Sequence, residues 1–403
     1  MGMEHNISEC ISQDEPLFNA PIHVDFDMTN ACNLACHHCH AASGKRQRDE
    51  LTSEEIKRAI AELHQNGVID LTIAGGEPFL RPELPEILEY AHSCQGIYTT
   101  VVTNGTLLKR DTVKKLSSNC SGVNFNISID GSTPDKLDIL RHRKKRDSNK
   151  RTLLFRQVTA GAKAISDAGL TLGVSFVVSG MNADDLENVY DMAVNELGAK
   201  SVTAIRFFPA GFGKSALSEL ALKYEEWEKI ILDLTRRHDS FQNLTISVSA
   251  PWEIYLPLLN NGYTPQQVWE IWQYRSTLTD PVYSSEYQVG DASGIGDLNI
   301  SGNGKVYPSV LMSGNHDVLC GNIREQSLKE IWYNSYTLKK LRNIRLSEIG
   351  GPCLDCHIRD LCGAGSRSRA LSITGSIYGL DHWCPVIAET YRRKNHVIAL
   401  QKQ

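Results

Sequence analysis

The sequence has no excess of positive charge, because its 42 Lys and Arg residues face 47 Asp and Glu residues and leave a formal charge of −5. Binding to nucleic acid through broad phosphate neutralisation is therefore not expected. Long apolar runs are also missing, since the longest mainly apolar stretch, 169–178, is too short to span a bilayer. Residues 1–15 lack the charged and then apolar layout of a signal peptide. These absences predict a soluble cytoplasmic protein that has neither nucleic acid nor a membrane as a partner.

The chain has enough material for a large core, with 403 residues of which 41% are apolar. This length predicts two domains or one elaborated barrel and excludes a small disulfide scaffold. Eleven cysteines are present, in two clusters and four isolated positions: Cys32, Cys36 and Cys39; Cys353, Cys356, Cys362 and Cys384; and Cys10, Cys94, Cys120 and Cys320. In a reducing cytoplasm such clusters are typical of metal or iron–sulfur ligands rather than of disulfides.

Short β-rich runs alternate with helical patterns over the first half of the chain. The predicted strands are residues 23–29, 71–74, 98–103, 123–129, 171–178 and 202–208. The predicted helices between them are residues 52–66, 85–92, 111–116, 157–168 and 184–197. This alternation predicts a parallel sheet with helices outside it, because parallel strands need crossover connections. Ligands of such sheets gather at the carboxyl ends of the strands.

The pattern changes after Pro209. A helix is predicted over 224–238, and a long irregular region, 251–293, follows it. Two short strands then flank Ser301-Gly302-Asn303-Gly304, a hairpin signature, since Asn-Gly supplies the positive φ that such turns need. A further helix, 327–342, leads into the last cysteine cluster.

The first cysteine cluster follows the first predicted strand. Cys32, Cys36 and Cys39 lie within eight residues and can hold three irons of a [4Fe–4S] cube, which leaves the fourth iron without a protein ligand. An open coordination site is what distinguishes a metal centre that binds substrate from a purely structural one. The alternative is a structural zinc knuckle that uses Cys36, Cys39 and a neighbouring histidine.

The Cys-x3-Cys-x2-Cys loop after a first strand resembles that of the radical S-adenosylmethionine (SAM) superfamily. Three further segments match in order, each at the end of a predicted strand: Gly75-Gly76-Glu77-Pro78, Thr103-Asn104-Gly105 and Ser128-Ile129-Asp130-Gly131. The resemblance covers residues 20–210. It implies a partial (β/α)6 barrel, an α/β fold, in which the open iron is chelated by the amino and carboxylate groups of SAM.

The same resemblance assigns contacts to SAM. Glu77 and the backbone around it receive the methionine ammonium, and Asn104 ends the third strand as in many members. Ser128 and Asp130 contact the ribose or the carboxylate, and Arg141 donates to the carboxylate by analogy, with a solvated arginine as the alternative. One electron from the reduced cluster then breaks the S–C5′ bond and yields a 5′-deoxyadenosyl radical that abstracts hydrogen from the substrate.

The second cysteine cluster, Cys353, Cys356, Cys362 and Cys384, provides four ligands, which is enough to close a second [4Fe–4S] cluster completely. Structural zinc is the alternative, because four thiolates also suit a tetrahedral ion. The segment resembles the SPASM extension of radical SAM enzymes, supported by Gly321-Asn322-Ile323 and Glu330-Ile331-Trp332 just upstream.

The full SPASM pattern supports two auxiliary clusters, and this chain departs from it. Ser309 and Ser366 stand where the family has cysteines, and the region of the earliest ligands, 289–294, has none. We therefore expect only the second auxiliary cluster to be retained, for two [4Fe–4S] clusters in total. Cys320 is left over, as a core or loop thiol or, alternatively, as a catalytic hydrogen-atom donor or a substitute cluster ligand.

Two other segments invite interpretation. The basic run 141–151 is either a solvated loop or a docking site for an anionic substrate or an electron donor such as flavodoxin or ferredoxin. Phe207-Phe208-Pro209-Ala210-Gly211-Phe212-Gly213-Lys214 resembles a family turn in which Phe212 replaces arginine.

The predicted organisation has four parts: an N-terminal extension, 1–19; the radical SAM barrel, 20–215; a bridging, substrate-covering region, 216–300; and a small SPASM-like domain, 301–403. The predicted activity is hydrogen abstraction from a biosynthetic intermediate, because the 31 residues before Cys32 are too few for a leader-peptide recognition domain. Maturation of a ribosomally made peptide and modification of a tetrapyrrole side chain are the enzymatic alternatives. An iron–sulfur electron-transfer protein is the alternative outside enzymes.

Overall fold

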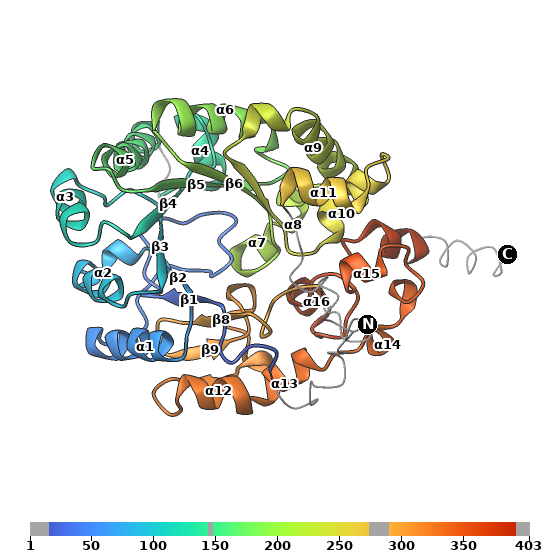
Figure 1. Ribbon diagram of the computed structural model, residues 1–403. Coiled ribbons are helices and arrows are strands. Elements are labelled where there is room, and N and C mark those ends of the chain that lie inside the picture. The colour runs from blue at the N-terminus through green and yellow to red at the C-terminus, as the bar shows by residue number, and fades with distance from the viewer. Residues whose placement is uncertain (1–15, 144–147, 274–289, 392–403) are drawn as a thin grey trace, which may run out of the picture.

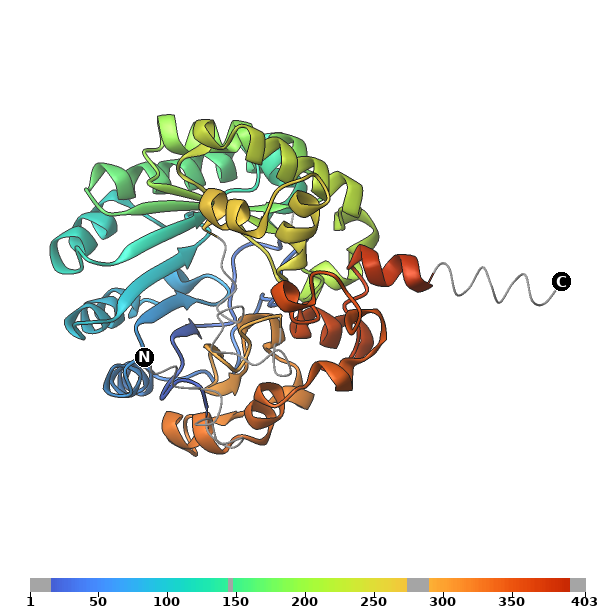
Figure 2. The ribbon, with the colours of Figure 1, turned by 45° about the vertical axis from the view of Figure 1, so that its right-hand side comes forward.

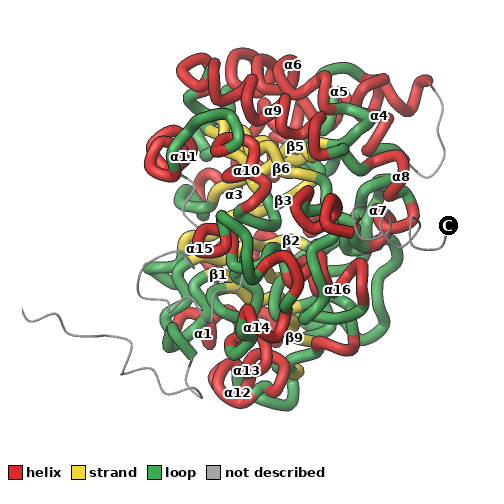
Figure 3. The backbone as a smooth tube through the Cα atoms, turned by 90° about the vertical axis from the view of Figure 1, so that its right-hand side faces the viewer, coloured by secondary structure: helices red, strands yellow, loops and turns green. Residues whose placement is uncertain are grey.

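The computed structural model describes residues 16–143, 148–273 and 290–391 (Figure 1). Most of the predicted N-terminal extension and residues 144–147 of the basic run lie outside these described residues. A single curved sheet of ten strands forms the centre, in the order β10-β9-β8-β1-β2-β3-β4-β5-β6-β7. Helices cover its outer face, as the tube view shows (Figure 3).

Seven strands run parallel in chain order: β1 (His23–Asp27), β2 (Asp70–Ala74), β3 (Tyr98–Thr103), β4 (Asn124–Ser128), β5 (Leu172–Val178), β6 (Ser201–Arg206) and β7 (Leu244–Ser247). The predicted mixed α/β fold with a parallel sheet is confirmed. The seventh strand was not predicted from sequence, because it is only four residues long and exposes Thr245 and Ser247.

The predicted hairpin joins the same sheet instead of forming a separate one. Its strands are β8 (Asp297–Ile300) and β9 (Lys305–Tyr307), and β10 (Gly321–Asn322) pairs with β9. β8 lies parallel to β1, with Asp297 opposite His23. The hairpin therefore crosses the predicted boundary at residue 300, and the four-part division of the chain stays a prediction.

The helices up to the seventh strand are α1 (Ser53–Gln65), α2 (Leu84–Ser93), α3 (Arg110–Asn119), α4 (Pro134–Leu140), α5 (Ser148–Asp167), α6 (Leu186–Asp191), α7 (Gly211–Ser215), α8 (Leu217–Leu220) and α9 (Tyr224–Arg236). α1 begins with a capping box, in which Thr52 Oγ1 accepts from Glu55 N and Thr52 N donates to Glu55 Oε2. The predicted helix 184–197 is broken into a 3₁₀ turn, α6 and a π turn, Met192–Glu196.

The later helices are α10 (Trp252–Leu259), α11 (Pro265–Trp272), α12 (Leu328–Asn334), α13 (Tyr336–Arg342), α14 (Leu346–Ile349), α15 (Arg359–Cys362) and α16 (Arg367–Thr374). The helix predicted over 327–342 is divided in two, since Ser335 has a ψ of 123° and so ends α12 before α13 begins. Figure 1 shows the orange helices α12 and α13 below β9, and Figures 1 and 2 show the red helices at one side of the barrel, where α15 lies next to α10. No helix of the described ranges is long and apolar enough to cross a membrane.

Burial alternates along the strands and separates two faces of the sheet. In β1, Val24 and Phe26 are fully buried, whereas His23, Asp25 and Asp27 are partly accessible. The first pair packs in the main core beneath the helices, so the second set lines the inside of the curved sheet. The C-terminal helices have their own apolar cluster, which includes three of the late cysteines.

Candidate active site

The loop that carries Cys32, Cys36 and Cys39 lies at the carboxyl edge of the parallel strands and is held there by backbone hydrogen bonds to two other segments. Ala35 N donates to His142 O at 2.8 Å, and His37 N donates to Leu140 O at 2.8 Å. From the turn after β6, Phe212 N donates to Cys39 O at 2.9 Å. The predicted turn 207–214 therefore supports the cysteine loop directly.

Gly75 and Gly76, which follow β2, let this loop pass very close to the neighbouring strand end. Gly76 N donates to Thr29 O at 2.7 Å, and Gly75 has a φ of +126°. A Cβ at Gly76 would lie 2.2 Å from Ala31 O, and one at Gly75 would lie 2.5 Å from Thr29 O. Only glycine fits both positions, because a Cβ would collide with backbone.

Glu77 is fully buried and binds the end of β3. Its Oε1 accepts from Thr103 Oγ1 at 2.8 Å and from Phe79 N at 3.1 Å, and its Oε2 accepts from Asn104 N at 2.9 Å. Burial raises the pKa of Glu77, and these three donors oppose that effect. A carboxylate has about four acceptor positions, so one is left for the ammonium that the sequence analysis assigned to it. Pro78 begins the short 3₁₀ turn that follows.

Asn104 connects the end of β3 to the cysteine loop. Its Nδ2 donates to Asn33 Oδ1 at 2.9 Å, and its Oδ1 accepts from Thr106 Oγ1 at 2.6 Å. Asn33 Nδ2 in turn donates to Thr106 Oγ1 at 2.8 Å. Sequence reasoning missed Asn33 and Thr106, although both adjoin motifs that it had singled out.

Asp130 and Arg141 form a buried ion pair beside the cysteine loop. Arg141 Nε contacts Asp130 Oδ2, and Arg141 Nη1 donates to Cys36 Sγ at 3.8 Å. Asp130 is fully buried, and its Oδ1 also accepts from Val177 N at 2.7 Å. The arginine predicted to face the carboxylate of SAM thus places its positive charge against Cys36, and its contact with SAM stays a prediction.

Two further side chains complete this part of the site. His38 Nε2 lies 3.4 Å from Asp130 Oδ2, and burial lowers the pKa of His38 to about 4, so the ring is neutral at pH 7. Ser128 Oγ accepts from Ser175 Oγ at 3.3 Å on the neighbouring strand. His38 was not predicted, although its place between two loop cysteines was a signal that could have identified it.

The three thiols suit an iron–sulfur cluster by their chemistry. Burial raises the pKa of Cys36 to about 12, while Arg141 acts to lower it. A thiol in this environment ionises when a metal replaces its proton. The Arg141 guanidinium then faces the Cys36 thiolate and is a charge-assisted donor to it. Donors of this kind stabilise metal ligands from outside the first coordination shell.

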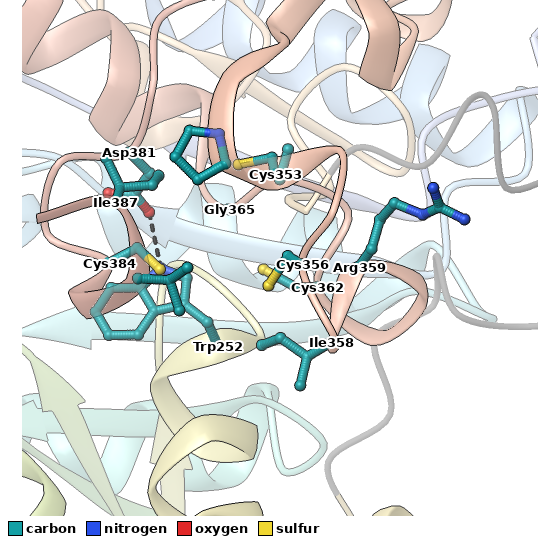
Figure 4. A pocket seen from close by; sticks show the side chains of 13 residues that line it. Trp252, Cys353, Cys356, Ile358, Arg359, Cys362, Gly365, Asp381, Cys384 and Ile387 are labelled. Carbon is teal, nitrogen blue, oxygen red and sulfur yellow. Dashed lines mark hydrogen bonds between the residues drawn. The ribbon is translucent and has the colours of Figure 1, made fainter. Parts of the chain in front are cut away.

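The second cysteine group also comes together in space. Cys353, Cys356, Cys362 and Cys384 line one cavity with Trp252, Asp381 and apolar side chains. Figure 4 shows Cys384 on one side of this cavity and Cys356 and Cys362 on the other. Among the described residues no three His, Cys, Asp or Glu side chains lie close enough to hold one metal ion. The four thiols therefore line one cavity, and four thiolates are the ligand set of a [4Fe–4S] cube.

Three serine hydroxyls meet where the sequence analysis expected a lost cluster. Ser293 Oγ donates to Ser309 Oγ at 2.9 Å and lies 2.9 Å from Ser368 Oγ. Ser366 Oγ donates to Asp291 Oδ2 at 3.2 Å. The four serines are buried, and their hydrogen bonds are made within the protein. Sequence reasoning found Ser309, Ser366 and the segment 289–294 that contains Ser293, but it missed Ser368, which only folding brings to this place.

This serine cluster predicts the iron content. Anaerobically reconstituted protein is expected to carry about eight irons per chain, which corresponds to two cubanes. The measurement is a colorimetric iron assay together with the EPR spectrum of the reduced protein. About twelve irons would show that a third cluster forms despite the serines.

Cys320 lies away from both cysteine groups, in the main core. Its Sγ donates to Val318 O at 3.6 Å, and burial raises its pKa to about 12. These surroundings match the core-thiol interpretation, and the catalytic role stays a prediction. In the described part of the basic run, Arg143 Nη2 donates to Gln157 Oε1 at 2.5 Å and Arg151 Nη1 donates to Asp135 Oδ1 at 2.7 Å.

Comparison with known proteins agrees with this geometry. Residues 26–193 match the radical SAM superfamily, and residues 293–357 match the SPASM iron–sulfur cluster-binding domain. The second match contains Cys353 and Cys356 and ends before Cys362 and Cys384. An AdoMet-dependent heme synthase of Methanosarcina barkeri is 30% identical over 91% of this chain and 97% of its own length. Mycofactocin maturase MftC of Mycolicibacterium smegmatis is 25% identical over 94% of this chain and 86% of its own length.

Solved structures share the fold. SuiB of Streptococcus suis bound to S-adenosylmethionine superimposes with a TM-score of 0.69 at 16% identity, over 91% of this chain and 78% of that one. The structure named anSMEcpe with bound AdoMet superimposes with a TM-score of 0.65 at 19% identity, over 95% of this chain and all of that one. The predicted family, fold and cofactor classes are confirmed. The chain belongs to the radical SAM superfamily of enzymes and carries a SPASM iron–sulfur domain.

Proposed function

We propose that Cys32, Cys36 and Cys39 ligate the [4Fe–4S] cluster that binds SAM and leave its fourth iron open. When bound, this cluster supplies the electron that cleaves SAM to methionine and a 5′-deoxyadenosyl radical, which abstracts hydrogen from the substrate. The observation that carries the assignment is the three-thiol loop at the carboxyl edge of the sheet, held against Gly75 and Gly76 by backbone hydrogen bonds.

The chain's other residues bind and orient SAM in this proposal. Gly75, Gly76 and Pro78 shape the wall beside the cysteine loop, and Glu77 uses its remaining acceptor position for the ammonium. Asn104 fixes that wall to the loop. Ser128 and Asp130 end β4 and precede α4 on the adjacent side, where Arg141 holds its charge between Asp130 and Cys36. The proposed auxiliary [4Fe–4S] cluster is ligated by Cys353, Cys356, Cys362 and Cys384.

The substrate is a small biosynthetic intermediate in this proposal, and the leading class is a tetrapyrrole side chain. Support comes from the heme synthase of M. barkeri, which matches this chain over nearly its whole length, and from a second protein of that organism, Fe-coproporphyrin III synthase, which is 28% identical. The second candidate is a peptide, which the similarity to mycofactocin maturase favours. The proposed reductant is a cytoplasmic flavodoxin or ferredoxin that docks on the basic run 141–151.

Reconstitution without oxygen tests the activity and the substrate class. Protein, SAM and dithionite are incubated with Fe-coproporphyrin III, with a synthetic peptide or with neither, and 5′-deoxyadenosine is measured by mass spectrometry. We expect the porphyrin to increase 5′-deoxyadenosine formation above the value without substrate, and a deuterated porphyrin to transfer deuterium to it. A peptide that alone gave transfer would replace the tetrapyrrole proposal, and no 5′-deoxyadenosine from protein with both clusters would contradict the site assignment.

A further inference from the structure

A group of four buried charges joins the barrel to the C-terminal helices. Arg206 at the end of β6 pairs with Glu253 of α10, with Nη1 and Oε1 2.6 Å apart. Arg369 of α16 donates to the same Glu253 oxygen at 3.0 Å and to both oxygens of Asp381 at 2.8 and 2.7 Å. None of the four side chains is more than 3% exposed. We call Arg206, Glu253, Arg369 and Asp381 the charge quartet.

Indole rings enclose the charge quartet and exclude water from it. The Arg206 guanidinium lies 4.9 Å from the ring centre of Trp227 and 5.2 Å from that of Trp252. The Arg369 guanidinium lies 5.3 Å from Trp252 and 5.0 Å from Trp383. In such surroundings each charge acts over a longer range than in water, because the local dielectric constant is low.

Stability alone gives no reason for these charges. Burying ions costs free energy, and well-packed apolar residues in place of a buried ion pair are often neutral or stabilising. Each charge nevertheless has an opposite partner: Arg206 and Arg369 both contact Glu253, and Asp381 accepts from Arg369 through both oxygens and from Trp252 Nε1. The quartet therefore sets two arginines against two carboxylates.

The quartet ends at the four-cysteine cavity. Asp381 and Trp252 line that cavity, and Trp252 Nε1 donates to Asp381 Oδ2 at 2.9 Å, as Figure 4 shows. Cys384 N donates to Asp381 O at 2.9 Å. A change of charge at Asp381, or at its partner Arg369, therefore changes the electrostatic potential at a group bound in the cavity.

The other end of the quartet lies near the first cysteine loop. Arg206 precedes Phe207, whose ring centre lies 6.2 Å from that of Trp383. Phe207 also packs against Gly213. The neighbouring residue in the same turn, Phe212, donates its N–H to Cys39 O. One buried network thus spans the space between the two cysteine sites.

We propose that the charge balance of the quartet sets the reduction potential of the iron–sulfur cluster at the four-cysteine site, with Asp381, which lines the cavity, and its partner Arg369 as the positioning residues. Arg359 also lines the cavity and Arg367 is buried on α16, and both stay unchanged in every variant of the test. Net charge, hydrogen bonding and burial are the factors by which proteins set such potentials. The inference rests on the proposed ligation of the auxiliary cluster by Cys353, Cys356, Cys362 and Cys384.

Opposite charge changes test the proposal. In a Cys36→Ala background, which removes the first site and all turnover, the potential of the remaining cluster is measured by redox titration with EPR detection. Asp381→Asn leaves an extra positive charge and is expected to raise the potential, because reduction adds negative charge to the cluster. Arg369→Met leaves an extra negative charge and is expected to lower it. The double variant restores the balance and is expected to return the potential close to its starting value.

Asp185→Asn is the matched control. This buried carboxylate precedes α6, on the far side of the barrel from α16, and accepts from Ser132 N and Oγ. Its removal is expected to leave the potential unchanged. Single variants that lose the auxiliary iron would show that the quartet assembles the site rather than adjusting its potential, and would overturn the proposal.

Three further outcomes overturn the proposal: single variants that match the control, single variants that shift the potential in the same direction, or a double variant without auxiliary iron. The last would mean that the quartet assembles the site rather than adjusting its potential. A background protein with an intact quartet but no second cluster would contradict the ligand assignment itself, and with it this inference. That result is distinguishable, because it appears before any quartet residue is changed.

Discussion

Replacing Cys36 with alanine is expected to reduce 5′-deoxyadenosine formation to the background of an assay without protein. Two remaining thiolates do not hold a cube with a single open iron in a defined orientation, and Arg141 keeps Asp130 but loses its contact with Cys36. The iron content should fall from about eight to about four per chain, since only the auxiliary cubane is left. Mass spectrometry of the product and the iron assay measure the two effects separately.

The controls for Cys36→Ala lie in the same chain. Cys94→Ala removes a partly exposed thiol outside both cysteine groups and is expected to change neither iron content nor SAM cleavage. Cys353→Ala is expected to lower the iron content to a similar extent through the other site. SAM cleavage that persists in Cys36→Ala would show that the open cluster is elsewhere.

The second large effect is expected from Gly76→Ala, although it adds only one methyl group. The new Cβ would lie 2.2 Å from Ala31 O and 2.9 Å from Asn30 O, and backbone atoms cannot move aside as a flexible side chain can. The loop that begins at Ala31 must therefore shift, and it carries the three cysteines. We expect loss of the iron at the first site and of SAM cleavage, with the auxiliary EPR signal unchanged.

Gly44→Ala is the matched control for this substitution. Gly44 belongs to the same loop, and its carbonyl accepts from Cys32 N at 3.2 Å, but a Cβ there meets nothing within 4 Å. We expect this variant to keep its iron and its SAM cleavage. A Gly76→Ala protein with full iron and activity would mean that the close approach of the two loops is not needed for the site.

Much of the candidate site was readable from the sequence because its parts are local. Three thiols within eight residues, and a glycine pair at a strand end, are features of short segments and can be recognised without knowing the fold. The residues that these segments contact in the folded protein could not be identified from the sequence. Arg141 was predicted to face SAM, and its position between Asp130 and Cys36 depends on how β4, α4 and the cysteine loop pack together. Asn33 and Thr106 were missed for the same reason, since each matters through its hydrogen bonds to the other and to Asn104.

The sequence by itself determined the family, the parallel α/β architecture and both cysteine groups, because hydrophobic periodicity and ligand spacing are properties of short stretches of chain. Tertiary structure decided the rest. It placed β8 beside β1, brought Ser293 to Ser309 and Ser368, and joined Arg206, Glu253, Arg369 and Asp381 into one buried network. These contacts join residues that are far apart in the chain, and their free energy depends on burial and on pairing with a specific partner, neither of which exists before the chain has folded.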